Sequence, residues 1–250
     1  MKYIVAVLAC VAFAYASPTR VVNGTDADIK DYPYIVSLQD FNSHSCGGSI
    51  IDAKHILTAA HCVYGSTTSY MTIQYGLTNL DSSEGQSISV DNISIHPNFY
   101  YSDPFPYDVA VLTLKDSIRF SDVAQPVNLP AQDEAAPVNE PSVLVGWGAR
   151  ETWGGTSSTL QKVQLKIYSH EDCKAAHSSV IYEHNLCSGV VEGWKGQCSG
   201  DSGGPLTAGG KQHGVVSWSR KPCAIVGYPG VYARVSSYID WIHEKVAESS

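Results

Sequence analysis

The sequence predicts an all-β protein that ends in a single α-helix. Short apolar runs recur along the chain with Gly, Pro or other turn residues between them. The clearest runs are residues 34–38, 56–60, 109–114, 142–146 and 214–218. In addition, Val163, Leu165 and Ile167 alternate with Gln164 and Lys166, as in a strand with one buried face. This rhythm is typical of a β-sandwich or a β-barrel.

The C-terminal segment follows a different period. Ser236 or Ser237 is expected to cap a helix there, and Asp240 is expected to lie near its positive end. The apolar stripe of this helix is predicted to pack on the β-domain as part of the core. From Val235 onward its apolar residues recur at helical spacing, at Tyr238, Ile239, Ile242 and Val246.

Composition and charge limit the classes of function. The chain has 250 residues, of which 44% are hydrophobic and 16% are charged. These values suit one large or two small globular domains with a sizeable core. The formal net charge is -8. An acidic excess disfavours binding to nucleic acid, so we expect no nucleic-acid partner.

Residues 1–16 are predicted to be a secretory signal peptide. Lys2 precedes an apolar run, residues 4–14, that is too short to span a bilayer. Ala14, Tyr15 and Ala16 then supply the small-x-small cleavage pattern. The alternative is a buried N-terminal strand or helix. No later stretch is long and apolar enough to be an anchor, so we expect a secreted, soluble, extracellular product without a membrane partner.

The cysteine count agrees with secretion. Cys10 falls within the signal peptide, which leaves six of the seven cysteines in the mature chain. An even number in a secreted chain predicts three disulfides, and fifteen pairings are open. Zinc binding is the competing interpretation, but no cysteine or histidine cluster has zinc spacing, so we expect no metal site. The six cysteines are Cys46, Cys62, Cys173, Cys187, Cys198 and Cys223.

Three residues stand in settings that suggest chemistry. Ser202 lies in GDSGGP (200–205), where glycines leave room for free backbone N–H groups around a hydroxyl. His61 lies in LTAAHC (57–62), and Asp108 opens the apolar run DVAVL (108–112). Together they are a nucleophile, a base and a carboxylate that orients the base. Nucleophilic acyl transfer uses these three roles.

With these motifs the chain resembles the chymotrypsin-like (trypsin-fold) serine peptidases, in particular invertebrate-type chymotrypsins with three disulfides. The resemblance runs from Val21 to about Val246. It implies two six-stranded antiparallel β-barrels with the active site in the cleft between them, and no cofactor. It rests on TAAHC (58–62), DVAVL (108–112), GWG (146–148), GDSGGP (200–205), SW (217–218) and PGVY (229–232).

The resemblance also implies catalytic roles. Ser202 would attack the scissile carbonyl, His61 would accept its proton, and Asp108 would hold the imidazole tautomer. The N–H groups of Gly200 and Ser202 would form the oxyanion hole. The segment that pairs with the substrate backbone would be Ser217, Trp218 and Ser219.

The resemblance also implies how the cysteines pair. The disulfides would be Cys46–Cys62, Cys173–Cys187 and Cys198–Cys223.

The N-terminal junction resembles the activation site of the same family. Residues 17–20 would be a short propeptide, and residues 21–250 would be the peptidase domain. Cleavage after Arg20 would free the α-amine of Val21, which would pair with Asp201 and order the oxyanion hole. A separate trypsin-like activating protease is the expected upstream partner, and protein protease inhibitors are expected partners of the mature monomer.

The specificity pocket is where the chain departs from trypsin. Gly196 stands six positions before the nucleophile, where trypsin-type members carry an aspartate that holds Lys or Arg. Gly230 leaves space, Ser219 narrows the mouth slightly, and Gln197 could partly fill the base. Lys195 would oppose a cationic side chain. We expect a neutral, fairly open pocket and cleavage after Tyr, Phe or Leu, with elastase-like cleavage after smaller apolar residues as the alternative.

Two other classes of function compete with this interpretation. GDSGG also fits the nucleophile elbow of α/β-hydrolases, for which Asp240 and His243 would complete a triad. However, these two lie on one predicted helix, and the chain lacks alternating strands and helices. A catalytically silent binding homologue is the second alternative, but such proteins usually lose a triad member.

Surface modification and calcium binding leave weaker signals. Asn23 and Asn92 begin N-glycosylation acceptor triplets. Some family members bind calcium in a loop that corresponds to residues 76–86. Here Leu77 stands at the first ligand position, and Asp81 and Glu84 fit the pattern poorly. We therefore predict no calcium requirement.

Overall fold

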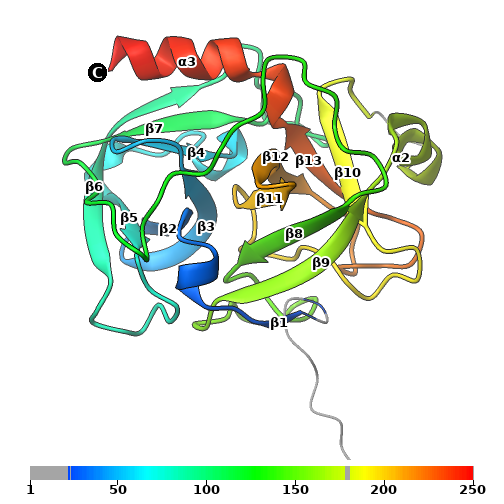
Figure 1. The fold of residues 1–250 in the computed structure, drawn as a ribbon, viewed down its shortest axis with the longest axis horizontal. Coiled ribbons are helices and arrows are strands. Elements are labelled where there is room, and N and C mark those ends of the chain that lie inside the picture. Colours follow the sequence, from blue (N-terminus) through cyan, green and yellow to red (C-terminus); the bar gives the residue numbers. More distant parts are fainter. Residues whose placement is uncertain (1–21, 23, 178–180, 250) are drawn as a thin grey trace, which may run out of the picture.

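The computed structural model describes residues 22, 24–177 and 181–249. Its first half forms a closed antiparallel barrel of six strands (Figure 1). The predicted signal peptide, the propeptide, Arg20, Val21 and Asn23 lie outside the described residues. In spatial order the barrel strands are β2 (Ile35–Asp40), β3 (Ser43–Ile50), β4 (His55–Thr58), β7 (Ala110–Leu114), β6 (Gln86–Ile95) and β5 (Met71–Tyr75).

The second half forms another closed six-stranded barrel, because β8 pairs with both β9 and β11. The short strand β1 (Thr25–Asp26) adds to the outside of β9. The expected pair of six-stranded barrels is therefore confirmed. In spatial order the second barrel contains β8 (Pro141–Gly146), β9 (Gln161–Ile167), β10 (Asn185–Gly189), β13 (Gly230–Arg234), β12 (Lys211–Trp218) and β11 (Pro205–Ala208).

The predicted strands are present with shifted ends. In β9, Val163, Leu165 and Ile167 are buried, while Gln164 and Lys166 are exposed, which confirms the alternation. The expected strand at residues 56–60 is shorter, because β4 ends at Thr58. The chain then turns into a short 3-10 helix, Ala60–Cys62, that carries His61.

The α-helices α2 (His170–His177) and α3 (Ile239–Glu248) lie outside the barrels. Helix α3 packs Ile239 and Ile242 into a cluster that includes Val111 of the first barrel and Val215 of the second. The predicted serine cap is wrong. Tyr238 is the N-cap residue without a side-chain cap, because Val235–Ser237 forms a 3-10 turn before α3. Asp240 lies in the first helical turn, as expected.

The two barrels have separate apolar interiors. Leu38, Ile56 and Leu112 are fully buried in the first, and Leu144 and Leu206 are fully buried in the second. Each such side chain contributes about 1.5–3 kcal/mol through removal of apolar surface from water. The two packed barrels hold the loops between them in place.

Among the described residues, no helix is long and apolar enough to cross a membrane.

The three disulfides pair as the resemblance implies. They join Cys46 to Cys62, Cys173 to Cys187, and Cys198 to Cys223. The first links β3 to the 3-10 helix of His61, and the third links the two segments that flank the predicted specificity pocket. Both disulfides therefore restrain loops of the candidate site.

Candidate active site

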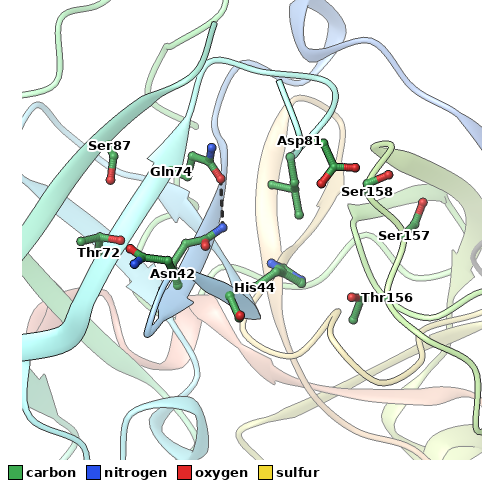
Figure 2. Close-up of a pocket in the computed structure, with 12 residues that line it drawn as sticks. Asn42, His44, Thr72, Gln74, Asp81, Ser87, Thr156, Ser157 and Ser158 are labelled. Carbon is green, nitrogen blue, oxygen red and sulfur yellow. Dashed lines mark hydrogen bonds between the residues drawn. The ribbon is translucent and has the colours of Figure 1, made fainter. Parts of the chain in front are cut away.

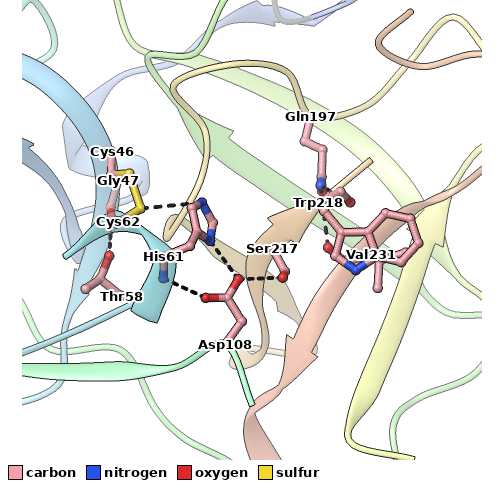
Figure 3. A network of polar contacts seen from close by, with 10 residues as sticks. All are labelled: Cys46, Gly47, Thr58, His61, Cys62, Asp108, Gln197, Ser217, Trp218 and Val231. Carbon is pink, nitrogen blue, oxygen red and sulfur yellow. Dashed lines mark hydrogen bonds and ion pairs between the residues drawn. A yellow bond between two sulfur atoms is a disulfide. The ribbon is translucent and has the colours of Figure 1, made fainter. Parts of the chain in front are cut away.

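His61 and Asp108 form a hydrogen-bonded pair between β4 and β7 (Figure 3). The Nδ1 atom of His61 lies 2.7 Å from Oδ2 of Asp108, and the backbone N–H of His61 donates to Oδ1 at 2.9 Å. The Asp108 side chain is fully buried, whereas 14% of the His61 side chain is exposed. Because an ionised carboxylate only accepts hydrogen bonds, Nδ1 of His61 carries a proton. In the neutral imidazole Nε2 is then free to act as a base.

Ser217 supplies a third donor to Asp108. Its hydroxyl lies on β12 of the second barrel and donates to Oδ2 of Asp108 at 2.5 Å. Sequence analysis expected Ser217 only as a partner of the substrate backbone. The hydroxyl contact joins residues 109 positions apart, so no local pattern could have revealed it.

Ser202 lies on the loop before β11, and the next residue of this loop, Gly203, lies against Thr58 and Ala59, shortly before His61. The Ser202 carbonyl accepts the N–H of Gly47 at 2.7 Å, which ties the loop to the first barrel. Within the described residues, no hydrogen bond joins Ser202 Oγ to His61 Nε2. The latter lies 3.8 Å from Cys62 Sγ (Figure 3). Such bonds are often long in unliganded enzymes and tighten when substrate binds.

Two N–H groups beside Ser202 are unbonded. In the loop that the structure describes, the N–H groups of Asp201, Gly203 and Gly204 donate to backbone carbonyls. Those of Gly200 and Ser202 make no hydrogen bond there. Gly200 has a φ of +94°, a conformation that favours glycine. The loop thus presents two free donors next to the Ser202 hydroxyl, which suits binding of an oxyanion.

His44 supports this loop from the first barrel. Its Nε2 donates to the carbonyl of Gly200 at 3.0 Å, and its Nδ1 accepts from the Ser37 hydroxyl at 2.7 Å. Burial lowers the pKa of His44, which favours the neutral ring. His44 also lines a hollow of about 580 Å³ whose walls carry hydroxyl and amide groups (Figure 2). Sequence analysis missed His44, since its partner lies 156 positions away.

The carboxyl group of Asp201, the residue before Ser202, is held by two backbone N–H groups. The group is buried and accepts the N–H of Gly148 at 3.0 Å and the N–H of Cys198 at 2.9 Å. Burial raises the pKa of Asp201 to about 6, although both hydrogen bonds and the Lys221 ammonium oppose that rise. A buried carboxyl with a raised pKa favours a cationic partner.

Gln197 lines the predicted specificity pocket, as do Gly196, Ser219 and Gly230. Its side chain is buried, and Nε2 donates to the Trp218 carbonyl at 2.8 Å (Figure 3). The remaining cavity measures about 10 Å³, roughly the space of one water. This cavity is narrower than the fairly open pocket expected from the sequence, and the buried Gln197 side chain lies in its lining, which agrees with the suggestion that it could partly fill the base.

The fit of Gln197 depends on Gly230. A β-carbon on Gly230 would lie 2.6 Å from Oε1 of Gln197 and 2.8 Å from its Cδ. The same Oε1 atom is buried and has no hydrogen-bond partner among the described residues. No Asp or Glu lines the described pocket, whereas Lys195 does. The pocket therefore offers no negative charge to a cationic side chain.

Asn92, the first residue of a predicted glycosylation acceptor triplet, is exposed on β6, where its Nδ2 donates to Ser94 Oγ at 3.2 Å.

One group of side chains has the residue types of a metal site. Potential ligand atoms of Cys46, Cys62 and His61 lie within 4.8 Å of one another. However, the two sulfur atoms are joined in a disulfide and do not act as thiolate ligands.

Comparison with known proteins agrees with this geometry. The family model described as Trypsin matches residues 21–242. The chain is 39% identical to Trypsin-1 of Astacus astacus, over 89% of this chain and 98% of that protein. It is 38% identical to Trypsin 5G1 of Aedes aegypti, over 92% of this chain and 86% of that protein. It is 34% identical to the vitellin-degrading protease of Bombyx mori, over 93% of this chain and 90% of that protein. The chain therefore belongs to the trypsin family of chymotrypsin-like peptidases and is a serine endopeptidase.

Proposed function

We propose that this endopeptidase works through a triad of Ser202, His61 and Asp108. Ser202 attacks the scissile carbonyl while Nε2 of His61 takes its proton and later gives it to the leaving amine. Asp108 stabilises the imidazolium that forms in between. The supporting observation is the buried Asp108 carboxylate, which holds Nδ1 of His61 at 2.7 Å and leaves Nε2 unprotonated.

The tetrahedral oxyanion is bound by the N–H groups of Gly200 and Ser202. Both lack partners in the described loop, and His44 fixes the Gly200 carbonyl. Loss of one such donor raises the barrier by about 2.7–4 kcal/mol in a comparable enzyme. The substrate backbone pairs as an added strand with the end of β12, at Ser217 and Trp218, and with Ser219 just after it.

The enzyme is made as a secreted zymogen. Cleavage after Arg20 by a trypsin-like protease frees the α-amine of Val21, which enters the site of Asp201. The buried Asp201 carboxyl, with its raised pKa, supports this step, because an ammonium partner there offsets the cost of burial. The pKa of the paired amine is raised in turn. Activity is therefore present below that pKa and falls at alkaline pH.

Substrate choice falls on apolar side chains before the scissile bond. Gly196 supplies no carboxylate, and no Asp or Glu lines the described pocket, so a cationic side chain finds no opposite charge there. Cleavage follows Tyr, Phe or Leu where Gln197 moves aside. Elastase-like cleavage after small apolar residues is the second candidate, and the cavity of about 10 Å³ favours it.

The test is a cleavage profile. The secreted chain is activated with trypsin, the trypsin is removed, and a peptide library with all residues at the position before the cut is digested. We expect cuts after apolar residues and few after Arg or Lys. Dominant cleavage after Arg would contradict the proposed specificity. If the mature enzyme neither cleaves the library nor reacts with an organophosphonate, the chain is a silent binding homologue.

A further inference from the structure

Four stacked aromatic rings form a column that includes Tyr107, the residue next to Asp108. Tyr182 stacks on His184 at 5.1 Å, His184 on Tyr107 at 4.0 Å, and Tyr107 on His96 at 4.9 Å. Tyr182 and His184 belong to the second barrel, just before β10, whereas His96 and Tyr107 belong to the first, between β6 and β7. The column therefore bridges the two barrels beside Asp108.

Tyr107 is the residue immediately before Asp108, and its backbone is strained. It has a φ of +49°, which is rare for a bulky residue and persists only where the surroundings enforce it. Its carbonyl accepts the N–H of Val109 at 2.8 Å, so this turn sets the direction in which the chain delivers the carboxylate. A change in the backbone at Tyr107 would therefore move Asp108.

His184 holds the other side of this turn. Its Nε2 lies 3.2 Å from the backbone nitrogen of Tyr107 and accepts that N–H. His184 itself is fixed, because its carbonyl accepts the N–H of Arg234 at 2.9 Å on β13. The contact joins residues 77 positions apart and crosses from one barrel to the other.

We propose that His184 is a positioning residue for Asp108, and that its neutral imidazole fixes the Tyr107 backbone through this hydrogen bond. This inference rests on the proposed role of Asp108. A protonated His184 would present a second donor to the N–H and lose the bond. Burial, together with the nearby His96 and Arg234, lowers the pKa of His184 to about 4. The neutral, accepting ring is therefore the form present at neutral pH.

The charged neighbours of His184 are consistent with this role. Arg234 faces it from β13 and His96 from the end of β6, and both disfavour a second positive charge. Glu183 acts in the opposite direction, but its carboxylate is engaged by His170 at 3.1 Å and Lys174 at 2.8 Å on α2. The remaining neighbours, Tyr107, Tyr182 and Tyr238, present rings.

The test distinguishes the two properties of the His184 side chain, its hydrogen-bond acceptor and its stacking ring. His184→Phe keeps a stacking ring without an acceptor, and His184→Gln keeps an acceptor at the ε position without a ring. The control, Tyr182→Leu, disrupts the same column without touching the Tyr107 hydrogen bond. Each chain is activated with trypsin, titrated with an organophosphonate and assayed on one peptide at pH 8. His184→Leu provides a second acceptor-free side chain if the Phe variant is not secreted.

We expect kcat of the acceptor-free variant to fall about tenfold with KM within about twofold of wild type, because the substrate subsites are intact. His184→Gln restores most of kcat, and Tyr182→Leu lowers Tm while kcat stays near wild type. Equal kcat in the Phe and Gln variants, or an equal loss in Tyr182→Leu, would overturn the role of His184. Absence of turnover in wild type would instead overturn the proposed function.

Discussion

Gly148 and Asp201 are in such close contact that the second residue depends on the first having no side chain. The N–H of Gly148 donates to Oδ1 of Asp201 at 3.0 Å, and a β-carbon on Gly148 would overlap the Asp201 carboxyl group. Gly146 is nearly as close, because its β-carbon would lie 2.6 Å from the same oxygen. The GWG segment, which begins at the last residue of β8, therefore forms the binding site of the Asp201 carboxylate.

Gly148→Ala is expected to displace the Asp201 side chain and to destabilise the fold by about 3 kcal/mol. Trypsin-treated protein should then show little activity, because the loop that presents Gly200 and Ser202 loses its support. Tm and peptide hydrolysis are the measurements. Gly155→Ala is the matched control, since the structure has nothing within 4 Å of a β-carbon there. Equal behaviour of the two variants would contradict this account of Asp201.

Ser217→Ala removes the hydroxyl that donates to Asp108. A hydrogen bond to a charged group contributes about 1.5–3 kcal/mol, so we expect kcat/KM to fall tenfold or more. The expected cause is poorer orientation of His61. Ser142→Ala is the control, because that buried hydroxyl bonds Ser188 inside the second barrel. A steady-state assay in which Ser217→Ala keeps wild-type kcat/KM would show that the 2.5 Å contact is dispensable.

Gln197→Ala is expected to enlarge the specificity pocket. It removes the side chain that leaves only about 10 Å³, together with a buried oxygen that has no partner in the described structure. We expect kcat/KM for a Phe substrate relative to an Ala substrate to rise about tenfold, as expected for several added methylene-sized contacts. Gln197→Leu is the control that keeps the volume. An unchanged ratio in Gln197→Ala would show that Gln197 already moves aside in the wild type.

The raised pKa of Asp201 predicts how the stability of the uncleaved chain depends on pH. The folded chain keeps a proton on Asp201 up to a pH of about 6, whereas an aspartic acid in the unfolded chain loses its proton around its usual pKa of 3.8. Between these values the folded state holds more protons, so the free energy of unfolding falls as pH rises. The fall attributable to Asp201 is on the order of 3 kcal/mol.

Thermal unfolding between pH 3.5 and 7 tests this prediction. The lowered pKa of His184 acts with the opposite sign in the same range, because unfolding lets that ring bind a proton. Comparison with Asp201→Asn isolates the carboxyl contribution. As pH rises through this range, the Tm of the wild type should fall relative to the Tm of Asp201→Asn. A constant difference across the range would mean that Asp201 ionises as a free carboxyl.

Much of the fold could be predicted because its signals are local. Strand alternation at residues 163–167, the helical period after Val235 and the order of the family motifs all lie within short windows. The N-cap of α3 is Tyr238 and not the expected serine, because buried residues Val235 and Ser236 lie in a 3-10 turn, Val235–Ser237, that precedes the helix. Helix ends are set by such tertiary context more than by propensity.

The site could be predicted only in part, for the same reason. His61, Asp108 and Ser202 stand in recognisable segments. The contacts that orient them do not, since Ser217, His44 and His184 reach their partners across 77 to 156 positions. The conformation of Gln197 depends on the space left by Gly230 and on the Trp218 carbonyl. The sequence suggests that Gln197 could partly fill the base of the pocket, and the folded arrangement shows that about 10 Å³ is left beside it.

The most direct test of the central claim is covalent labelling of the nucleophile. The secreted chain, before and after cleavage at Arg20, is treated with an organophosphonate and the modified peptide is mapped by mass spectrometry. We predict one label per activated chain, on Ser202, with far slower labelling of the uncleaved chain and none in His61→Ala on the same timescale. A correctly cleaved chain that takes up no label at Ser202, or labels equally well without His61, would contradict the proposed triad.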